Sequence, residues 1–179
     1  MSTEDRLAAL ERKVQHFTDR EEILDCIIRN SRGNDRFDDM RTSGTYHADG
    51  VHEIGKSHIP GTQYGEHANH AHAAICEANL HNVTMHACEI DGDTAHAESY
   101  VIGLFLDKGC ETSRLLAGRY IDRLEKRDGR WAIVVRRATV EVVMEGSARL
   151  PNKSVLAGSG YLKGLLRLAQ LDILGDVEG

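Results

Sequence analysis

The chain has 179 residues, about the size of one ordinary domain and long enough for a hydrophobic core. Its 22 basic and 28 acidic residues give a formal net charge of −6, which argues against nucleic acid as a partner. There is no apolar run near the ~18 residues that span a bilayer, no signal-like N-terminus and no C-x-x-C pair. We therefore expect a soluble, cytoplasmic protein with free thiols, no metal and no membrane partner.

The chain begins with helical patterns. An apolar stripe at helical spacing predicts an amphipathic N-terminal helix, which we treat as residues 1–17. The stripe consists of Leu7, Leu10, Val14 and Phe17. Thr18 and Glu21 then have the spacing of a capping box, so a second helix is expected to begin at Thr18 and to end at Gly33. Asp35 follows, and its position is typical of an N-cap for the next short helix.

Three shorter elements are expected before the character of the chain changes. They are a helix at about residues 36–46, a strand in "DGVHEIG" and an alanine-rich helix over 64–79. The last one carries His67, His70 and His72. His72 falls on another side of the helix from the other two, and no carboxylate stands at zincin spacing, so a solvated or pocket-rim helix is favoured over a metal site.

The second half of the chain alternates between polar and apolar residues, which predicts β-strands. The expected strands cover residues 80–90, 94–106, 114–126 and 131–144. Asp-Gly turns join the first to the second and the third to the fourth, which is a strong hairpin signal. Helices followed by an antiparallel meander indicate an α+β fold, with a curved sheet wrapped around helices.

Residues 146–179 differ from the rest of the chain. A segment rich in Ser, Gly, Pro and Lys predicts a surface loop, and a stripe of apolar residues after it predicts a C-terminal helix. We expect that helix to pack on its own domain or on a neighbouring subunit.

Several polar side chains are predicted to lie on apolar strand faces. His81 shares a face with Val83 and Met85, where an imidazole needs a partner. Arg136 lies in an almost unbroken apolar row, which leaves two interpretations, contact with a substrate or a buried salt bridge with Glu98 or Asp35. Glu98 and Tyr100 share a strand face. Two interpretations of them remain, that they line a pocket or that they form surface contacts such as a salt bridge.

Four segments in order carry a resemblance to a known family. They are "DREEILDCIIRNSRGNDRFDDM", "YHADGVHEIG", "NLHNVTMHACEIDGDTAHAESY" and "AGRYIDRLEKRDGRWAIVVRR". Together they resemble the SnoaL-like branch of the NTF2-like superfamily, over a domain that we place at residues 18–145. The resemblance implies a cystatin-like cone, in which a strongly bent antiparallel sheet encloses an apolar pocket closed by N-terminal helices.

The resemblance also implies site residues. In dehydratase-like members an aspartate after the first long helix pairs with a histidine that opens a central strand, and Asp35 and His81 stand at these positions. Arg136 matches an arginine that the dehydrochlorinase uses. Asn30 stands where several relatives carry tyrosine or lysine. The expected catalytic residues are therefore Asp35, His81 and Arg136, with Asn30, Glu98 and Tyr100 binding substrate.

The function that these residues favour is a cofactor-independent lyase or isomerase acting on a small apolar, cyclic molecule. Two alternatives remain open, a ligand-binding domain without turnover and a small subunit of a ring-hydroxylating oxygenase. A homodimer or higher homo-oligomer is also expected, because the open face of the sheet is predicted to carry Trp131, Ile133 and Val135.

Overall fold

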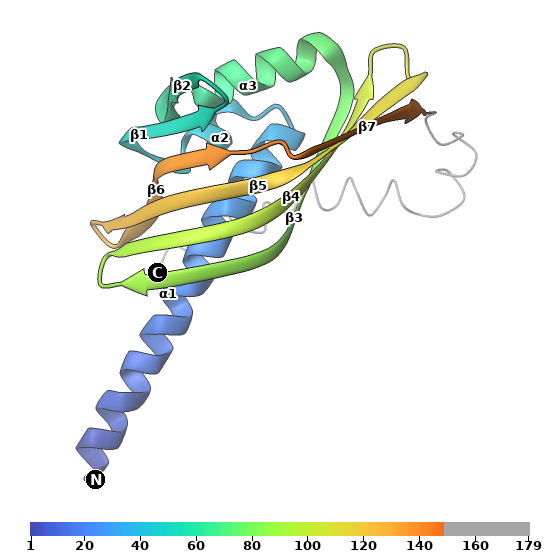
Figure 1. Ribbon diagram of the computed structural model, residues 1–179. Helices are drawn as coiled ribbons and strands as arrows, with labels where there is room; N and C mark the ends of the chain where they lie inside the picture. Colours follow the sequence, from blue (N-terminus) through green and yellow to red (C-terminus); the bar gives the residue numbers. More distant parts are fainter. Residues whose placement is uncertain (149–179) are drawn as a thin grey trace, which may run out of the picture. The chain divides into compact units, whose positions relative to one another are not determined.

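The computed structural model of the protein describes residues 1–148, and the predicted C-terminal helix lies outside the described residues. Within that range, helices and strands follow one another as Figure 1 shows: α1 (Thr3–Asp35), α2 (Asp39–Ser43), β1 (Tyr46–Ile54), β2 (Ser57–Pro60), α3 (Gly61–Ile75), β3 (Cys76–Asp91), β4 (Thr94–Asp107), β5 (Thr112–Arg127), β6 (Arg130–Ala138) and β7 (Val142–Ser147). A helix with the length and hydropathy of a membrane span is not found in this range.

Helix α1 is one continuous helix, so the predicted boundary at Thr18 was wrong. Its capping box lies at Ser2, whose hydroxyl accepts from the Asp5 amide while the Ser2 amide donates to the Asp5 carboxylate. Neither glycine nor proline interrupts the chain between Phe17 and Asp19, so the helix passes through Thr18 at little cost. It also passes Gly33 and ends at Asp35.

Asp35 does not act as an N-cap, the alternative to its predicted role in the site. Asp38 caps the short helix α2, and its side chain accepts a hydrogen bond from the Arg41 amide. The carboxylate of Asp35 is therefore free to make contacts outside its own helix.

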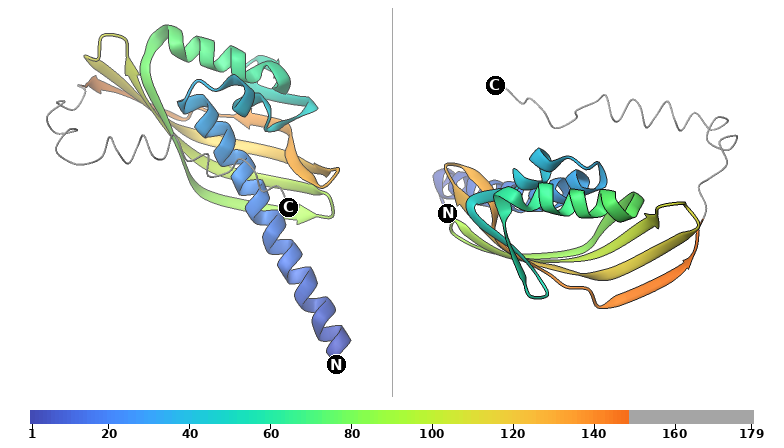
Figure 2. Two further views of the ribbon diagram at one scale, coloured as in Figure 1. Left: turned by 180° about the vertical axis from the view of Figure 1, so that it is seen from behind. Right: turned by 90° about the horizontal axis from the view of Figure 1, so that it is seen from above.

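The sheet is curved, unclosed and mixed, with strand order β2-β1-β6-β5-β4-β3. The antiparallel meander from β3 to β6 is confirmed. The bent sheet also contains one parallel pair that was not predicted, between β1 and β6. The predicted strand 131–144 is divided into two strands, β6 and β7. Each of them pairs with the long strand β5. All three helices lie on the concave face (Figure 2).

A bulge in β6 changes which residues face the helices. Leu124 pairs with Ile133 but Arg123 pairs with Val135, so Val134 is an extra residue in the ladder. As a result Trp131 and Ile133 face inward before the bulge and Arg136 faces inward after it. Trp131 and Ile133 are buried in the core, and the prediction that they form the open face of the sheet was wrong.

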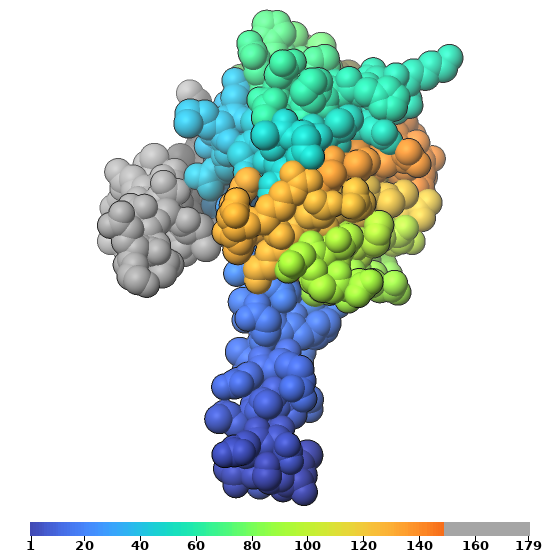
Figure 3. All heavy atoms as spheres, turned by 90° about the vertical axis from the view of Figure 1, so that its left-hand side faces the viewer, coloured from blue at the N-terminus to red at the C-terminus, as the bar shows by residue number. Residues whose placement is uncertain are grey.

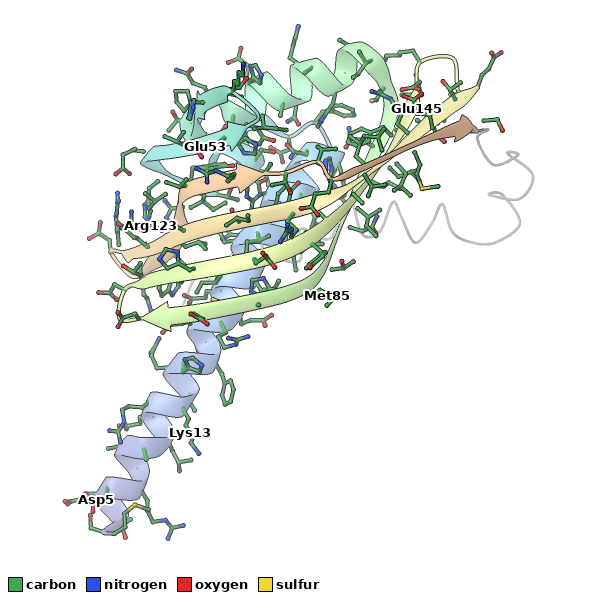
Figure 4. All side chains as sticks on the ribbon, viewed as in Figure 1. Asp5, Lys13, Glu53, Met85, Arg123 and Glu145 are labelled. Carbon is green, nitrogen blue, oxygen red and sulfur yellow. The ribbon has the colours of Figure 1, made fainter. Side chains whose placement is uncertain are left out.

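A second bulge has the same effect in β3. The pairing with β4 shifts between Thr84 and His86, and Met85 takes a positive φ of 22°. Met85 is exposed, as Figure 4 also shows, whereas His86 turns toward the interior and its Nδ1 lies 2.8 Å from the Ser99 hydroxyl. The predicted face of His81, Val83 and Met85 therefore holds only up to Val83.

Candidate active site

A cavity of about 110 Å³ is lined by α3 and by the strands of the curved sheet. Its apolar lining comes chiefly from Val101, Phe105, Leu116, Ala117 and Ala138. Its polar lining includes the imidazoles of His52, His72 and His81. Engineered protein cavities of about 150 Å³ hold benzene, so this volume limits an enclosed molecule to about one ring.

His81 meets Asp35 at the edge of this cavity. Asp35 Oδ1 lies 2.7 Å from His81 Nδ1 and accepts a second hydrogen bond from the His81 backbone amide at 2.8 Å. The side chains are 8% and 15% exposed, for His81 and Asp35 respectively, so water screens the contact little. The end of α1 and the inward face of β3 thus bring together the two residues paired by the resemblance.

Neighbouring groups fix the orientation of the carboxylate. With its amide nitrogen directed at Asp35, Asn79 donates to Oδ1 at 3.2 Å and also to the Asn34 carbonyl. A carboxylate accepts only, so Nδ1 of a neutral His81 carries the ring proton and Nε2 carries the lone pair. The arrangement therefore presents a proton acceptor whose tautomer is set by Asp35.

His72 brings a second imidazole to the cavity from helix α3. Its ring centroid lies 5.7 Å from that of His81, and both rings lie 5.4 Å from Phe105. Burial, and to a smaller extent the neighbouring His81, lowers the pKa of His72 to about 4. Its Nδ1 is buried and has no hydrogen-bond partner within residues 1–148. His72 is therefore neutral at pH 7, and its ring lines the cavity.

His52 on β1 completes the set of imidazoles. Its ring stacks on Tyr64 at a centroid distance of 3.6 Å, and its Nδ1 lies 2.8 Å from the Tyr46 hydroxyl. Burial, followed by the positive charge of Arg136, lowers the pKa of His52 to about 3. A neutral, immobilised His52 forms part of the cavity wall.

Arg136 lies in the core and is not among the residues that line the cavity. It forms a two-point ion pair with Asp122, at 2.8 Å and 2.7 Å, and donates to the Asn30 side chain at 2.8 Å. Burial disfavours the charged guanidinium, but Asp122 outweighs that effect and raises the pKa of Arg136 above its ordinary value. The salt-bridge interpretation thus holds with Asp122 as the partner, in place of Glu98 or Asp35.

Asn30 is buried by the same network. Its amide nitrogen donates to the Thr45 hydroxyl at 2.8 Å and to the Thr42 carbonyl at 3.2 Å, and its oxygen accepts from Arg136. Asn30 is not among the residues that line the cavity, so the structure does not bring it to the cavity wall.

Glu98 and Tyr100 lie on the opposite face of the sheet from the cavity. The inward residues of β4 are the odd-numbered ones from Ala95 to Phe105. Glu98 instead pairs with Arg119 at 3.2 Å, and the Arg119 guanidinium lies over the Tyr100 ring at 5.9 Å. The structure therefore does not bring these two predicted substrate-binding residues to the cavity, because the alternation was assigned to the wrong face.

Sequence reasoning missed both His52 and His72 as cavity residues, and a signal for His72 exists. Tyr64, Ala68 and His72 are four residues apart, so they share one face of α3. Ala68 is buried and the other two line the cavity, whereas His67 and His70 are exposed. Grouping His72 with Tyr64 instead of with the other histidines would have predicted its place.

Comparison with known proteins identifies the family. Residues 15–137 match the model of the SnoaL-like domain, and the chain belongs to that family. A search of curated proteins gave no match.

Solved structures share the fold. A variant of Rv3472, a protein of unknown function from Mycobacterium tuberculosis, is 26% identical, with a TM-score of 0.64 over 71% of this chain and 74% of that one. A type 2 hexachlorocyclohexane dehydrochlorinase (LinA) is 20% identical, with a TM-score of 0.72 over 78% and 98%. A scytalone dehydratase-like protein from Novosphingobium aromaticivorans is 14% identical, with a TM-score of 0.67 over 78% and 97%.

Proposed function

We propose that this protein is a cofactor-independent lyase or isomerase that removes a proton from carbon in a small one-ring molecule. The observation that carries the proposal is the contact between Asp35 and His81 at an apolar cavity. The names of two structural neighbours, a dehydrochlorinase and a scytalone dehydratase-like protein, fit elimination chemistry in a related fold.

In this proposal Nε2 of His81 is the general base. It takes the proton, and the electron pair of the C–H bond becomes the new double bond while a leaving group departs from the adjacent carbon. In a dehydration the protonated His81 returns that proton to the departing hydroxide, which leaves as water. Asp35 holds the tautomer and stabilises the imidazolium that forms between these steps.

His72 has a different role in this proposal, because a ring with a pKa of about 4 is unprotonated at pH 7 and has no imidazolium proton to donate. We assign to it a hydrogen bond to an oxygen of the ligand, because its ring lines the cavity and makes no hydrogen bond through Nδ1 within residues 1–148. The ligand is then an oxygenated ring, such as a cyclic ketone or alcohol, in preference to a hydrocarbon. Arg136 holds α1 against β6 and β5 and acts on the site only through the fold.

Hydrogen exchange tests the proposal without knowledge of the natural substrate. A panel of one-ring ketones would be incubated with the protein in D₂O, with binding and loss of the α-proton signals followed by ¹H NMR. Wild type should accelerate exchange of a bound ketone, and His81→Gln should abolish the acceleration. Bound ketones that exchange no faster with wild type than with His81→Gln would instead support a ligand-binding domain without turnover.

A further inference from the structure

The N-terminal half of α1 extends beyond the sheet (Figures 1 and 3). It carries a stripe of large, exposed apolar side chains. The stripe residues Leu7, Leu10, Val14 and Phe17 are 56%, 59%, 63% and 67% exposed. Within residues 1–148 the helix first bonds to the sheet at Asp19, which accepts from Lys126 and Trp131. A single helix of this length is marginal in water unless its apolar face packs against something. We therefore expect the stripe to pack against another apolar surface.

The spacing of the stripe matches a coiled coil. The intervals are three, four and three residues, which place Leu7 and Val14 at heptad position a and Leu10 and Phe17 at position d. A β-branched residue at a with leucine at d is the combination that favours two parallel strands, and Val14 and Leu10 supply it. The stripe is thus suited to a second helix of the same kind.

The charges that flank the stripe favour a parallel orientation of the second helix. Position g is basic throughout, with Arg6, Lys13 and Arg20, and position e carries Glu4 and Glu11. In a parallel pair each g residue faces the e residue five positions further along the other helix, so Arg6 meets Glu11 of the second copy. In an antiparallel pair g faces g and e faces e, which brings like charges together. Lys13 lies on the part of the helix that is clear of the sheet (Figure 4), and its e-position partner in a parallel pair is the neutral Thr18.

We propose that residues 3–18 pair in parallel with the same residues of a second copy of this chain, as a two-stranded coiled coil. The charges at positions g and e are complementary between two copies of the same helix, so we infer that the stripe binds a second copy of this chain. The pair would bury all four stripe residues from each copy. It would also stabilise the part of α1 that has no support from the sheet within residues 1–148.

Disulfide cross-linking of the full chain tests the proposal directly. In a parallel pair position 10 lies beside position 10 of the other copy, so Leu10→Cys should form a covalent dimer under mild oxidation. Arg12→Cys, at the outward f position, is the matched control and should remain a monomer on non-reducing gels, as should wild type with its four native cysteines. Absence of a Leu10→Cys cross-link would overturn the proposal, whatever else covers the stripe.

Charge reversal provides a second test by sedimentation equilibrium. Arg6→Glu and Glu11→Arg should each weaken dimerisation about two- to tenfold, and the two together should restore it, because each g–e pair is then opposite in sign again. Leu10→Glu with Val14→Glu should abolish the dimer. An antiparallel pair predicts tighter association for Arg6→Glu, and a dimer that persists in the Leu10→Glu/Val14→Glu variant belongs to another surface. Either result would overturn the proposal.

Discussion

Asp35 Oδ1 accepts two hydrogen bonds from the same residue, one from the His81 ring and one from the His81 backbone amide. The backbone contact fixes the end of helix α1 against strand β3, and the ring contact fixes the imidazole. One carboxylate oxygen therefore sets both the position and the tautomer of His81.

Removal of the Asp35 charge should reduce turnover with little loss of stability. Asp35→Asn keeps an oxygen for the backbone amide of His81 but loses the charge that stabilises the imidazolium. We expect the rate of α-proton exchange to fall by about 10²–10⁴-fold, the range for loss of general-base function. Asp38→Asn is the matched control, since it removes the same charge three residues away and asparagine also caps helices well. Equal exchange rates in both variants would exclude a role for Asp35.

Substitution of Arg136 should lower the stability of the fold, and it should affect activity only through that loss. Arg136→Met leaves Asp122 buried and unpaired, which should lower the free energy of unfolding in urea by about 3–5 kcal/mol. Arg136→Met combined with Asp122→Leu should recover most of that loss, because neither partner is then left as an isolated charge. If Arg136→Met instead lost activity at unchanged stability, Arg136 would have to contact the ligand.

His72 should distinguish oxygenated from hydrocarbon ligands. His72→Phe keeps a ring of similar size but removes both nitrogens, so affinity for phenol should fall about tenfold while affinity for toluene stays constant. Isothermal calorimetry with the two ligands measures this difference, and His70→Phe on the exposed side of α3 is the control. Parallel losses for phenol and toluene would assign His72 a packing role only.

Acid should destabilise the fold through its buried histidines. His52 has an ordinary pKa of 6.5 when unfolded and about 3 when folded, so the unfolded state binds more protons between these values. The stability that His52 contributes is fully present above pH 6.5 and is lost as the pH falls toward 3. The loss is about 1.4 kcal/mol per pH unit within that window.

Urea unfolding between pH 7 and pH 4 checks this dependence. His52→Phe keeps a ring to stack on Tyr64 and should show a shallower fall in stability with acid, whereas the exposed control His70→Asn should match wild type. A slope unchanged by His52→Phe would show that His52 takes up no proton on unfolding.

The sequence predicted the parts of the fold that depend on local pattern. The two Asp-Gly turns predicted the meander, and the resemblance paired Asp35 with His81. Face assignments failed for Met85, Trp131 and Ile133, because the bulges at Met85 and Val134 each insert one residue and reverse the alternation. Neither methionine nor valine marks a bulge in a sequence, so these reversals could not be predicted.

The partner of Arg136 escaped prediction for a related reason. Asp122 faces Arg136 across the β5–β6 ladder, and that register depends on the bulge at Val134. Without the register, Glu98 and Asp35 were equally plausible acids for an inward-facing arginine. The resemblance supplied the site residue His81, whereas the lining role of His72 required the positions of α3 and the cavity.

The tautomer of His81 is the most direct test of the account. A long-range ¹H–¹⁵N NMR spectrum of wild type, recorded at a pH where the His81 ring is neutral, reports which ring nitrogen carries the proton. The account predicts a proton on Nδ1, held by Asp35, and an unprotonated Nε2. A neutral ring with its proton on Nε2 in wild type would contradict it, because His81 would then present no base to the cavity.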